Sequence, residues 1–215
     1  MRKTKIESLK TRQHLMHAAL EVFYRQGVTR ATLQEIAQEA GVTRGALYWH
    51  FKNKEDLFAA MFEDFYNDIL SRFNPETVQQ APNAWQYLRD NLCDTLLFLA
   101  NNPTHQKFCS VITDKCEQIQ HNEQIIAMSK KYHECLFQQI AVALQMCVEQ
   151  KSLPENVNLH LAHIYLKSTV TGMIKLWLAT PESIDLTQLI VPFVDTSLGA
   201  LMHSPHLLQN PVQAA

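Results

Sequence analysis

Glycine, long apolar runs and paired cysteines are scarce in this sequence of 215 residues, and each shortage excludes a class of protein. There are 5 glycines, and none of them follows asparagine or aspartate, so the usual sequence signal for a tight β-hairpin is missing. An all-β sandwich or a glycine-dependent dinucleotide-binding enzyme is therefore improbable. The longest apolar run, residues 57–62, is far shorter than the roughly 18 residues that a membrane span needs.

The five cysteines, at positions 93, 109, 116, 135 and 147, form no Cys-x-x-Cys pair. An odd number of cysteines in this arrangement is typical of reduced thiols rather than of a disulfide framework or a structural zinc site. The basic N-terminus leads into no apolar stretch, so it does not have the pattern of a secretory signal. We expect a soluble, cytoplasmic protein that makes no contact with a membrane.

Catalytic and nucleotide-binding motifs are also missing. The sequence has no G-x-S-x-G, no P-loop, no G-x-G-x-x-G and no His-Glu-x-x-His, so an enzyme is the weakest interpretation and no cofactor is expected. Hydrophobic residues make up 47% of the chain and charged residues 19%, which is the composition of a folded protein. The length suits one large domain or two small ones.

Charge is unevenly distributed along the chain. Residues 1–56 carry a net charge of +4, and residues 57–215 carry −6. A small basic segment joined to a larger acidic one indicates that the first segment binds a polyanion. Ordinary variation between two solvated surfaces is the alternative explanation, and charge alone does not decide between them.

Apolar residues recur with helical spacing almost throughout, and nothing in the pattern predicts a strand. We predict an all-α fold of nine helices, with boundaries at about residues 8–26, 33–40, 44–50, 54–73, 85–99, 103–118, 122–150, 158–179 and 186–202. The polar segment 74–84, with Pro75 and Pro82, is the one break in composition. Pro75 is expected to end the helix before it. Pro192 is expected to kink the last helix or delay its start.

The clearest local signals surround residues 27–53. Gly27 is a natural helix terminator, and Thr32 and Glu35 have the spacing of a capping box. Thr43 and Asn53 are N-cap residues for the two helices that follow. Two short helices separated by a turn that contains a glycine form a helix-turn-helix.

The second helix of this motif has two unlike sides. At about 100° per residue, Leu47 and Phe51 must pack inward. Tyr48 and Trp49 then lie on the outer side, where exposed aromatic rings need a partner. The major groove of DNA is such a partner. The alternative is a helical module that uses its aromatic pair to contact another protein.

Each outward residue can make a specific contact with DNA. Arg44 can make a two-pronged hydrogen bond to a guanine, worth about 1–3 kcal/mol of base discrimination. Gly45 allows the helix backbone to approach the duplex closely. Phosphate oxygens suit the polar groups of Thr43, Tyr48, His50 and Lys54.

Residues 32–58, TLQEIAQEAGVTRGALYWHFKNKEDLF, resemble the N-terminal domain of TetR-family transcriptional regulators. The segment VTRGALYWHFKNK is similar to the AcrR and MtrR branch, whose members repress multidrug efflux operons. The resemblance implies a DNA-binding domain over 1–54, a connecting helix over about 54–73, and a ligand-binding and dimerisation domain within 55–215. It also implies a homodimer that binds a palindromic double-stranded operator and leaves it when a hydrophobic small molecule binds.

By the same resemblance, certain residues match the positions at which the family contacts DNA. These residues are Thr32, Thr43, Arg44, Gly45, Tyr48, Trp49, His50 and Lys54. Trp49 either packs or contacts the groove, and the basic arm of Arg2, Lys3 and Lys5 either adds phosphate contacts or is a solvated tail.

The helices at 158–179 and 186–202 are those with which the family builds its dimer interface, although an apolar stripe on its own also fits an internal core. A pocket in the larger domain would be lined by bulky apolar side chains with a few polar ones. The candidates are Phe65, Trp85, Phe98, Phe108, Tyr132, Phe137, Met146, Tyr165, Lys167, Thr171 and Trp177. The sequence does not decide the charge of the ligand.

Two other kinds of regulator fit the same motif. One is a DNA-bound adaptor that docks a protein partner and has no small-molecule inducer. The other responds to a thiol oxidant or a metal. His105, Cys109 and Cys116 share one helical face by spacing, and His160 and His163 lie three residues apart. A metal site needs three or four ligands that converge on one point, and neither set reaches that alone. We therefore expect no bound metal.

Overall fold

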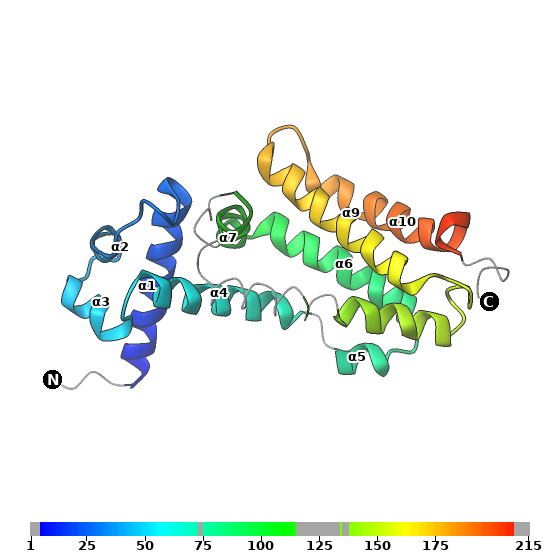
Figure 1. Cartoon of the computed structure of the whole chain (residues 1–215), viewed down its shortest axis with the longest axis horizontal. Helices are drawn as coiled ribbons and strands as arrows, with labels where there is room; N and C mark the ends of the chain where they lie inside the picture. The colour runs from blue at the N-terminus through cyan, green and yellow to red at the C-terminus, as the bar shows by residue number, and fades with distance from the viewer. Residues whose placement is uncertain (1–4, 73–74, 115–133, 135–137, 209–215) are drawn as a thin grey trace. The chain divides into compact units, whose positions relative to one another are not determined.

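The computed structural model describes residues 5–72, 75–114, 134 and 138–208, and most of these residues are helical (Figure 1). The one β feature within these ranges is an isolated antiparallel bridge between Val157 and Leu208. The all-α fold class is confirmed. None of the helices in the described ranges is long and apolar enough to cross a membrane.

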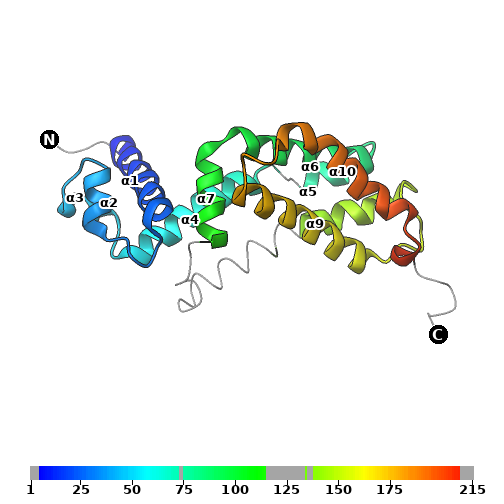
Figure 2. The same cartoon turned by 90° about the horizontal axis from the view of Figure 1, so that it is seen from above.

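The chain divides into two compact units, the first made of residues 1–68 and 103–131 and the second of residues 69–102 and 132–215. The first unit holds the N-terminal helices and one helix that comes later in the chain. These are α1 (Lys5–Gln26), α2 (Leu33–Glu39), α3 (Arg44–His50), most of α4 (Lys54–Leu70), and α7 (Pro103–Asp114). Helix α1 packs against both α2 and α7 (Figure 2).

The core of the first unit is built from residues that recur every three or four positions on α1 and α4, as the sequence predicts. The predicted core residues that are buried are Leu15, Ala19, Val22, Phe23, Leu57, Phe58, Met61, Phe62 and Phe65. Helix α7 adds Phe108, whose ring stacks on that of Phe65 with 5.0 Å between the centroids. This aromatic packing fixes α7 to the N-terminal helices rather than leaving it in the second unit.

The predicted cap residues set the boundaries of the short helices. The hydroxyl oxygen of Thr32 accepts a hydrogen bond from the backbone N–H of Glu35 (3.2 Å), and the Glu35 carboxylate accepts one from the N–H of Thr32 (2.9 Å). Thr43 and Asn53 each accept from the N–H three residues further on, at 3.2 Å and 2.7 Å. Gly27 has a φ of 82°, which explains why α1 ends where it does.

The second unit surrounds α6 with the C-terminal helices. Its elements are α5 (Pro75–Gln79), α6 (Ala84–Asn101), a helix over 138–149, α9 (Leu159–Ala179), α10 (Leu186–His203) and a 3₁₀ turn (Pro205–Leu207). Helix α10 packs against both α6 and α9 (Figure 2). Arg89 of α6 holds Asp195 of α10 with two hydrogen bonds, of 2.6 Å and 3.0 Å, and these bonds keep the pKa of the Asp195 carboxyl below its usual range.

The helix boundary predicted at Pro75 is wrong. Helix α4 ends at Leu70 rather than near residue 73, and Pro75 does not end it but begins α5, a position where the missing N–H of proline costs nothing. The polar segment 74–84 therefore contains a short helix that its composition concealed. Helix α10 begins at Leu186 and includes Pro192, so it has no late start. Residues 115–118, and residues 122–137 apart from residue 134, lie outside the described residues.

Candidate nucleic-acid interface

The turn between α2 and α3 depends on Gly41. Its φ of 61° lies in the left-handed region that residues with a Cβ rarely adopt. Apart from the adjacent residues, no described atom lies within 4 Å of a Cβ built there, so the requirement for glycine is conformational. The N–H groups of Gly41 and Val42 donate to the carbonyls of Gln38 (3.0 Å) and Ala37 (2.9 Å). These bonds satisfy the last carbonyls of α2 and turn the chain sharply into α3.

Helix α3 has the two sides that the sequence predicts. Leu47 is 0% exposed and the following C-cap residue Phe51 is 1% exposed, so both belong to the core. Tyr48 is 45% exposed and Trp49 is 72% exposed. An aromatic residue as open as Trp49 on a short helix is unusual for a surface that meets only water.

Arg44 and Tyr48 act as a pair on the exposed side of α3. The Arg44 guanidinium donates a hydrogen bond of 3.0 Å to the Tyr48 hydroxyl and lies 5.3 Å from the centre of its ring. The hydrogen bond holds the guanidinium beside Tyr48, which lies one turn further along α3. Because arginine has five N–H donors, most of them are still available to a guanine edge.

The protein interior gives no steric reason for glycine at position 45. A Cβ there would meet only the Thr43 hydroxyl oxygen, at 3.9 Å, which is an ordinary contact. Glycine inside a helix costs about 0.5–1 kcal/mol relative to alanine, so its presence needs another explanation. Close approach of an external surface to the α3 backbone is the explanation that the sequence predicts.

Arg12 of α1 holds the end of α3, a role that no pattern in the sequence indicates. Its guanidinium donates to the His50 carbonyl (3.1 Å) and lies 4.3 Å from the centre of the Phe51 ring. The His50 ring meets the Trp49 ring edge-on, with 4.7 Å between the centroids. The last turn of α3 is therefore held from the core side while Trp49 stays exposed.

Lys54 has a partner set that the sequence did not indicate. Its ammonium group donates to the carbonyls of Val28 (2.8 Å), Thr29 (3.0 Å) and Ala31 (3.0 Å), in the loop between α1 and α2. A lysine ammonium has three protons, and these three bonds use all of them. In this structure Lys54 closes the α1–α2 loop, and a phosphate contact by the same group stays a prediction.

We expect Lys54→Met to lower the free energy of unfolding by about 1.5–3 kcal/mol, the usual worth of hydrogen bonds to a charged group. The measurement is urea denaturation, with Lys52→Met as the matched control because Lys52 is exposed and should change stability by less than about 0.5 kcal/mol. Unchanged stability together with uniformly weaker DNA binding would instead support the phosphate contact.

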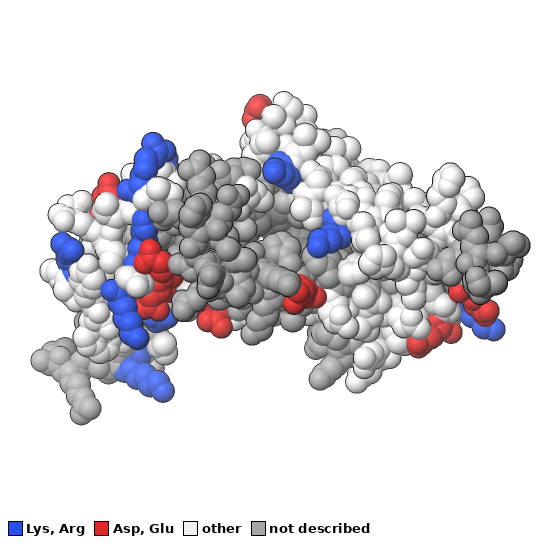
Figure 3. Space-filling model, in the orientation of Figure 1, with Lys and Arg blue, Asp and Glu red and all other residues white. Residues whose placement is uncertain are grey.

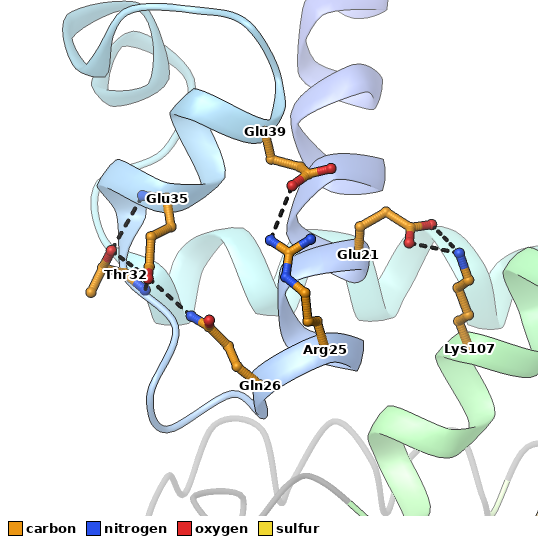
Figure 4. A network of polar contacts seen from close by, with 7 residues as sticks. All are labelled: Glu21, Arg25, Gln26, Thr32, Glu35, Glu39 and Lys107. Atoms are coloured by element: carbon orange, nitrogen blue, oxygen red, sulfur yellow. Dashed lines mark hydrogen bonds and ion pairs between the residues drawn. The ribbon is translucent and has the colours of Figure 1, made fainter.

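A network of polar contacts fixes α2 to α1 and α7 to α1 (Figure 4). Arg25 bonds to Glu39 (3.0 Å), the Gln26 amide donates to the Glu35 carboxylate (3.0 Å), and Lys107 contacts both oxygens of Glu21 (2.7 Å and 2.6 Å) (Figure 4). The Thr32 hydroxyl also donates to the Glu35 carboxylate, and this bond is the main cause that lowers the pKa of Glu35. The hydroxyl of Thr32, a predicted DNA contact, is thus exposed but already serves as the cap of α2.

Basic side chains gather over the N-terminal helices. On the face shown in Figure 3, most of the Lys and Arg side chains lie over α1–α3, and the surface over α9 and α10 shows few. This distribution agrees with the net charge of +4 on residues 1–56. The exposed side of α3 is therefore part of a basic surface, as contact with a polyanion requires.

The predicted pocket residues that the structure describes belong to both units. Phe65 and Phe108 belong to the core of the first unit, where their rings stack. In the second unit Phe98 lies under the Arg72 guanidinium, 3.3 Å from its ring centre, and Trp177 is buried. Half-buried side chains are found at Trp85, Met146 and Tyr165, and exposed ones at Lys167 and Thr171. Tyr132 and Phe137 lie outside the described residues.

Two separate hollows open on the second unit. One is lined by Trp177 together with Ala100 and residues 181, 182 and 184–187. The other lies between residues 134 and 138 and the first half of α9 and includes Lys167. Whether a ligand contacts any of the predicted pocket residues stays a prediction.

The thiols in the described part of the chain are poor candidates for an oxidant sensor. Burial raises the pKa of Cys109 to about 12, that of Cys147 to about 11, and also that of Cys93. A raised pKa keeps a thiol protonated, whereas a reactive cysteine needs a thiolate. Within the same residues no three His, Cys, Asp or Glu side chains converge as a metal site would require.

Helices α9 and α10 expose large apolar side chains, although they pack against each other. The exposed residues are Leu161, Ile164 and Leu176 on α9 and Leu189, Val191 and Met202 on α10. Apolar residues grouped in this way on neighbouring helices are typical of a surface that another chain covers. These helices are the ones predicted to form the dimer interface.

Comparisons with known proteins agree with this arrangement. Residues 15–61 match the family model of bacterial regulatory proteins of the tetR family, and residues 83–203 match that of the C-terminal region of MAATS-type transcriptional repressors. The chain is 34% identical to the HTH-type transcriptional regulator AcrR of Shigella flexneri over 213 residues, which cover 98% of this chain and 97% of AcrR.

Two solved structures have the same fold. MexZ, a key repressor responsible for antibiotic resistance in Pseudomonas aeruginosa, has a TM-score of 0.80 at 28% identity, over 94% of this chain and 99% of its own. SmeT, the repressor of the Stenotrophomonas maltophilia multidrug efflux pump SmeDEF, has a TM-score of 0.74 at 25% identity, over 90% of this chain and 91% of its own.

Proposed function

Because the chain belongs to the TetR family of bacterial transcriptional regulators, we propose that it represses a multidrug efflux operon and leaves its operator when an amphiphilic small molecule binds to the second unit. The efflux target is inferred from what SmeT represses and from the part that MexZ plays in antibiotic resistance. The protein would act in the cytoplasm, where the operator is.

The observation that carries the proposal is the exposed side of α3. Arg44, Tyr48 and Trp49 lie open on a short helix whose other side is fixed by Leu47 and Phe51 in the core. A helix held in this way can enter the major groove as a rigid body, with Arg44 reading a guanine and Gly45 permitting close approach. Thr43, Tyr48 and His50 would contact phosphates.

The protein would bind as a homodimer through the exposed apolar side chains of α9 and α10. Two copies related by a two-fold axis present two α3 helices, so the operator would be a palindrome. Its half-sites would lie about 34–36 Å apart, or a multiple of that distance, to match one turn of the DNA. A ligand that favours a subunit arrangement with a different spacing would weaken operator binding by about 5–150-fold, for a coupling of about 1–3 kcal/mol.

The test is fluorescence anisotropy of the full chain on its own upstream DNA at several salt concentrations, followed by a panel of dyes and amphiphiles. Tight binding that is reversed by at least one compound would support the proposal. Tight binding that no compound reverses would favour the adaptor that docks a protein partner. Absence of any preference for the upstream DNA over a scrambled duplex would overturn the proposed repression of the neighbouring operon.

A further inference from the structure

The first two turns of α1, residues 5–11, extend past the short helices α2 and α3 (Figure 1). The buried residues of α1 begin at Leu15, and every residue from 5 to 11 is exposed or half-buried. Two of them are large and apolar: Ile6 is 67% exposed and Leu9 is 54% exposed. The core of the first unit therefore does not explain why these two turns carry apolar side chains.

The positive charge of the N-terminal segment is concentrated in the same place. Residues 1–12 contain five Lys or Arg and one Glu, so they carry the whole net charge of +4 of residues 1–56. Residues 13–56 contain five basic and five acidic residues and are neutral overall. Within the described part of the chain, neither Lys5 nor Lys10 belongs to an ion pair. The attraction for a polyanion therefore comes mainly from the start of α1.

Helical geometry aligns this charge with α3. At about 100° per residue, Lys5, Leu9 and Arg12 lie within about 60° of one another around α1. Arg12 meets α3 directly, because its guanidinium donates to the His50 carbonyl (3.1 Å). At about 1.5 Å per residue, Leu9 and Lys5 continue this face for about 5–10 Å beyond Arg12. The start of α1 therefore adjoins the last turn of α3, which carries the exposed Trp49.

We propose that the first two turns of α1 are a second DNA-binding element, which lies on the sugar-phosphate backbone beside the major groove that α3 enters. The inference deepens the proposed function and rests on it. Lys5 and Lys10 contact phosphates, and Ile6 and Leu9 pack against deoxyribose rings. Charge complementarity favours DNA as the partner, because a duplex carries one negative charge per about 1.7 Å of its axis. Helix α3 itself contributes one arginine, so this element supplies most of the attraction that does not depend on sequence.

The double variant Lys5→Gln, Lys10→Gln tests the phosphate contacts through their salt dependence. It removes two contacts from each subunit of a dimer, and each contact contributes about 0.9 to the slope of log affinity against log salt concentration. The slope should therefore become shallower by about 3–4. Fluorescence anisotropy of the full chain between about 50 and 200 mM salt measures it. At the lowest salt, affinities for operator and scrambled duplexes should both fall by about 10-fold or more and by the same factor.

Two further variants separate the parts of the element. Ile6→Gln combined with Leu9→Gln keeps every charge, so it should weaken binding to both duplexes without changing the salt slope. Lys151→Gln is the matched control, because Lys151 is exposed in the second unit and should leave affinity and slope unchanged. Residues 5–11 lie outside the core, so the midpoint of urea denaturation should stay the same in all variants.

A salt slope that Lys5→Gln, Lys10→Gln leaves unchanged would overturn the inference. Assembly of the free protein beyond a dimer, abolished by Ile6→Gln, Leu9→Gln, would also overturn it, because the apolar pair would then bind a second copy of the chain. If the lysine variant binds both duplexes normally while Arg44→Ala still loses the preference for the operator, this inference falls and the proposed function stands. If the unaltered protein does not prefer the operator, the proposed function falls, and the salt slope on the scrambled duplex still decides the inference.

Discussion

Replacing Arg44 by alanine is expected to remove most of the preference of the protein for its operator over other DNA. The Arg44 guanidinium lies exposed at the start of α3, oriented by its 3.0 Å hydrogen bond to the Tyr48 hydroxyl. One two-pronged contact to guanine is worth about 1–3 kcal/mol, and a dimer makes it twice, so the ratio of specific to non-specific affinity should fall by about 30-fold or more. Fluorescence anisotropy on operator and scrambled duplexes measures this ratio.

Two further variants separate base recognition from attraction to phosphate. Lys52→Ala removes an exposed positive charge next to α3 and should weaken binding to both duplexes about equally, with a shallower salt dependence. Tyr48→Phe keeps the ring beside Arg44 but removes the hydroxyl that accepts its hydrogen bond, so it should cost less specificity than Arg44→Ala. If Arg44→Ala lowered affinity for both duplexes alike, Arg44 would be a phosphate contact and another residue would read the bases.

The sequence predicted the helix-turn-helix well because its signals are local. A cap acts on an N–H two or three residues away, and a left-handed glycine affects only its own turn, so Thr32, Thr43 and Gly41 could be interpreted from neighbouring residues alone. The division of α3 into a buried and an exposed side follows from helical geometry, and the burial of Leu47 and Phe51 confirms it.

The supports of the site could not be predicted in the same way. The ammonium of Lys54 bonds to carbonyls 23 to 26 residues away, and Arg12 reaches the His50 carbonyl across 38 residues. No periodicity or spacing records such contacts, because they depend on how separate helices pack. From the sequence alone, the position of Lys54 at the start of a helix predicted only an anion contact.

Tertiary packing also decided where two predicted pocket residues lie. Any bulky apolar residue on a helix fits both a core and a ligand wall, and the sequence offers no means of choosing between them. Phe65 and Phe108 stack on each other inside the first unit, a contact that needs α7 to fold back onto the N-terminal helices.

Leu176→Glu is expected to convert the protein to a monomer. Operator affinity should then fall by about 100-fold or more, because each half-site is bound without the help of the other. Leu176 is 58% exposed on α9, so a glutamate there should change the stability of the single chain by about 0.5 kcal/mol or less. Under a partner subunit the same carboxylate would be buried without a counter-charge, which is strongly unfavourable. Analytical ultracentrifugation gives the oligomeric state.

Leu97→Glu is the matched control, because Leu97 is 45% exposed in the same unit but lies on α6 rather than on α9 or α10. It should leave both assembly and operator affinity unchanged. If Leu97→Glu had the same effect as Leu176→Glu, loss of solubility or folding rather than loss of an interface would be the cause. A dimer that survives Leu176→Glu would show that Leu176 is not part of the interface.

Gly172 lies one turn before Leu176. The effect of Gly172→Ala on stability should have opposite signs in an isolated subunit and in a dimer that packs closely at this point. Apart from the adjacent residues and the backbone of α9 itself, no described atom lies within 4 Å of a Cβ built at Gly172, so in an isolated subunit Gly172→Ala should stabilise α9 by about 0.5–1 kcal/mol. If a second α9 or α10 approaches closely at this point, the added methyl group meets it, and the dimer dissociates more readily. Urea denaturation should therefore show that Gly172→Ala raises the free energy of unfolding at protein concentrations below the dissociation constant, where single chains prevail. Above the dissociation constant, where dimers prevail, the same substitution should lower it. A rise at both concentrations would place the interface away from Gly172.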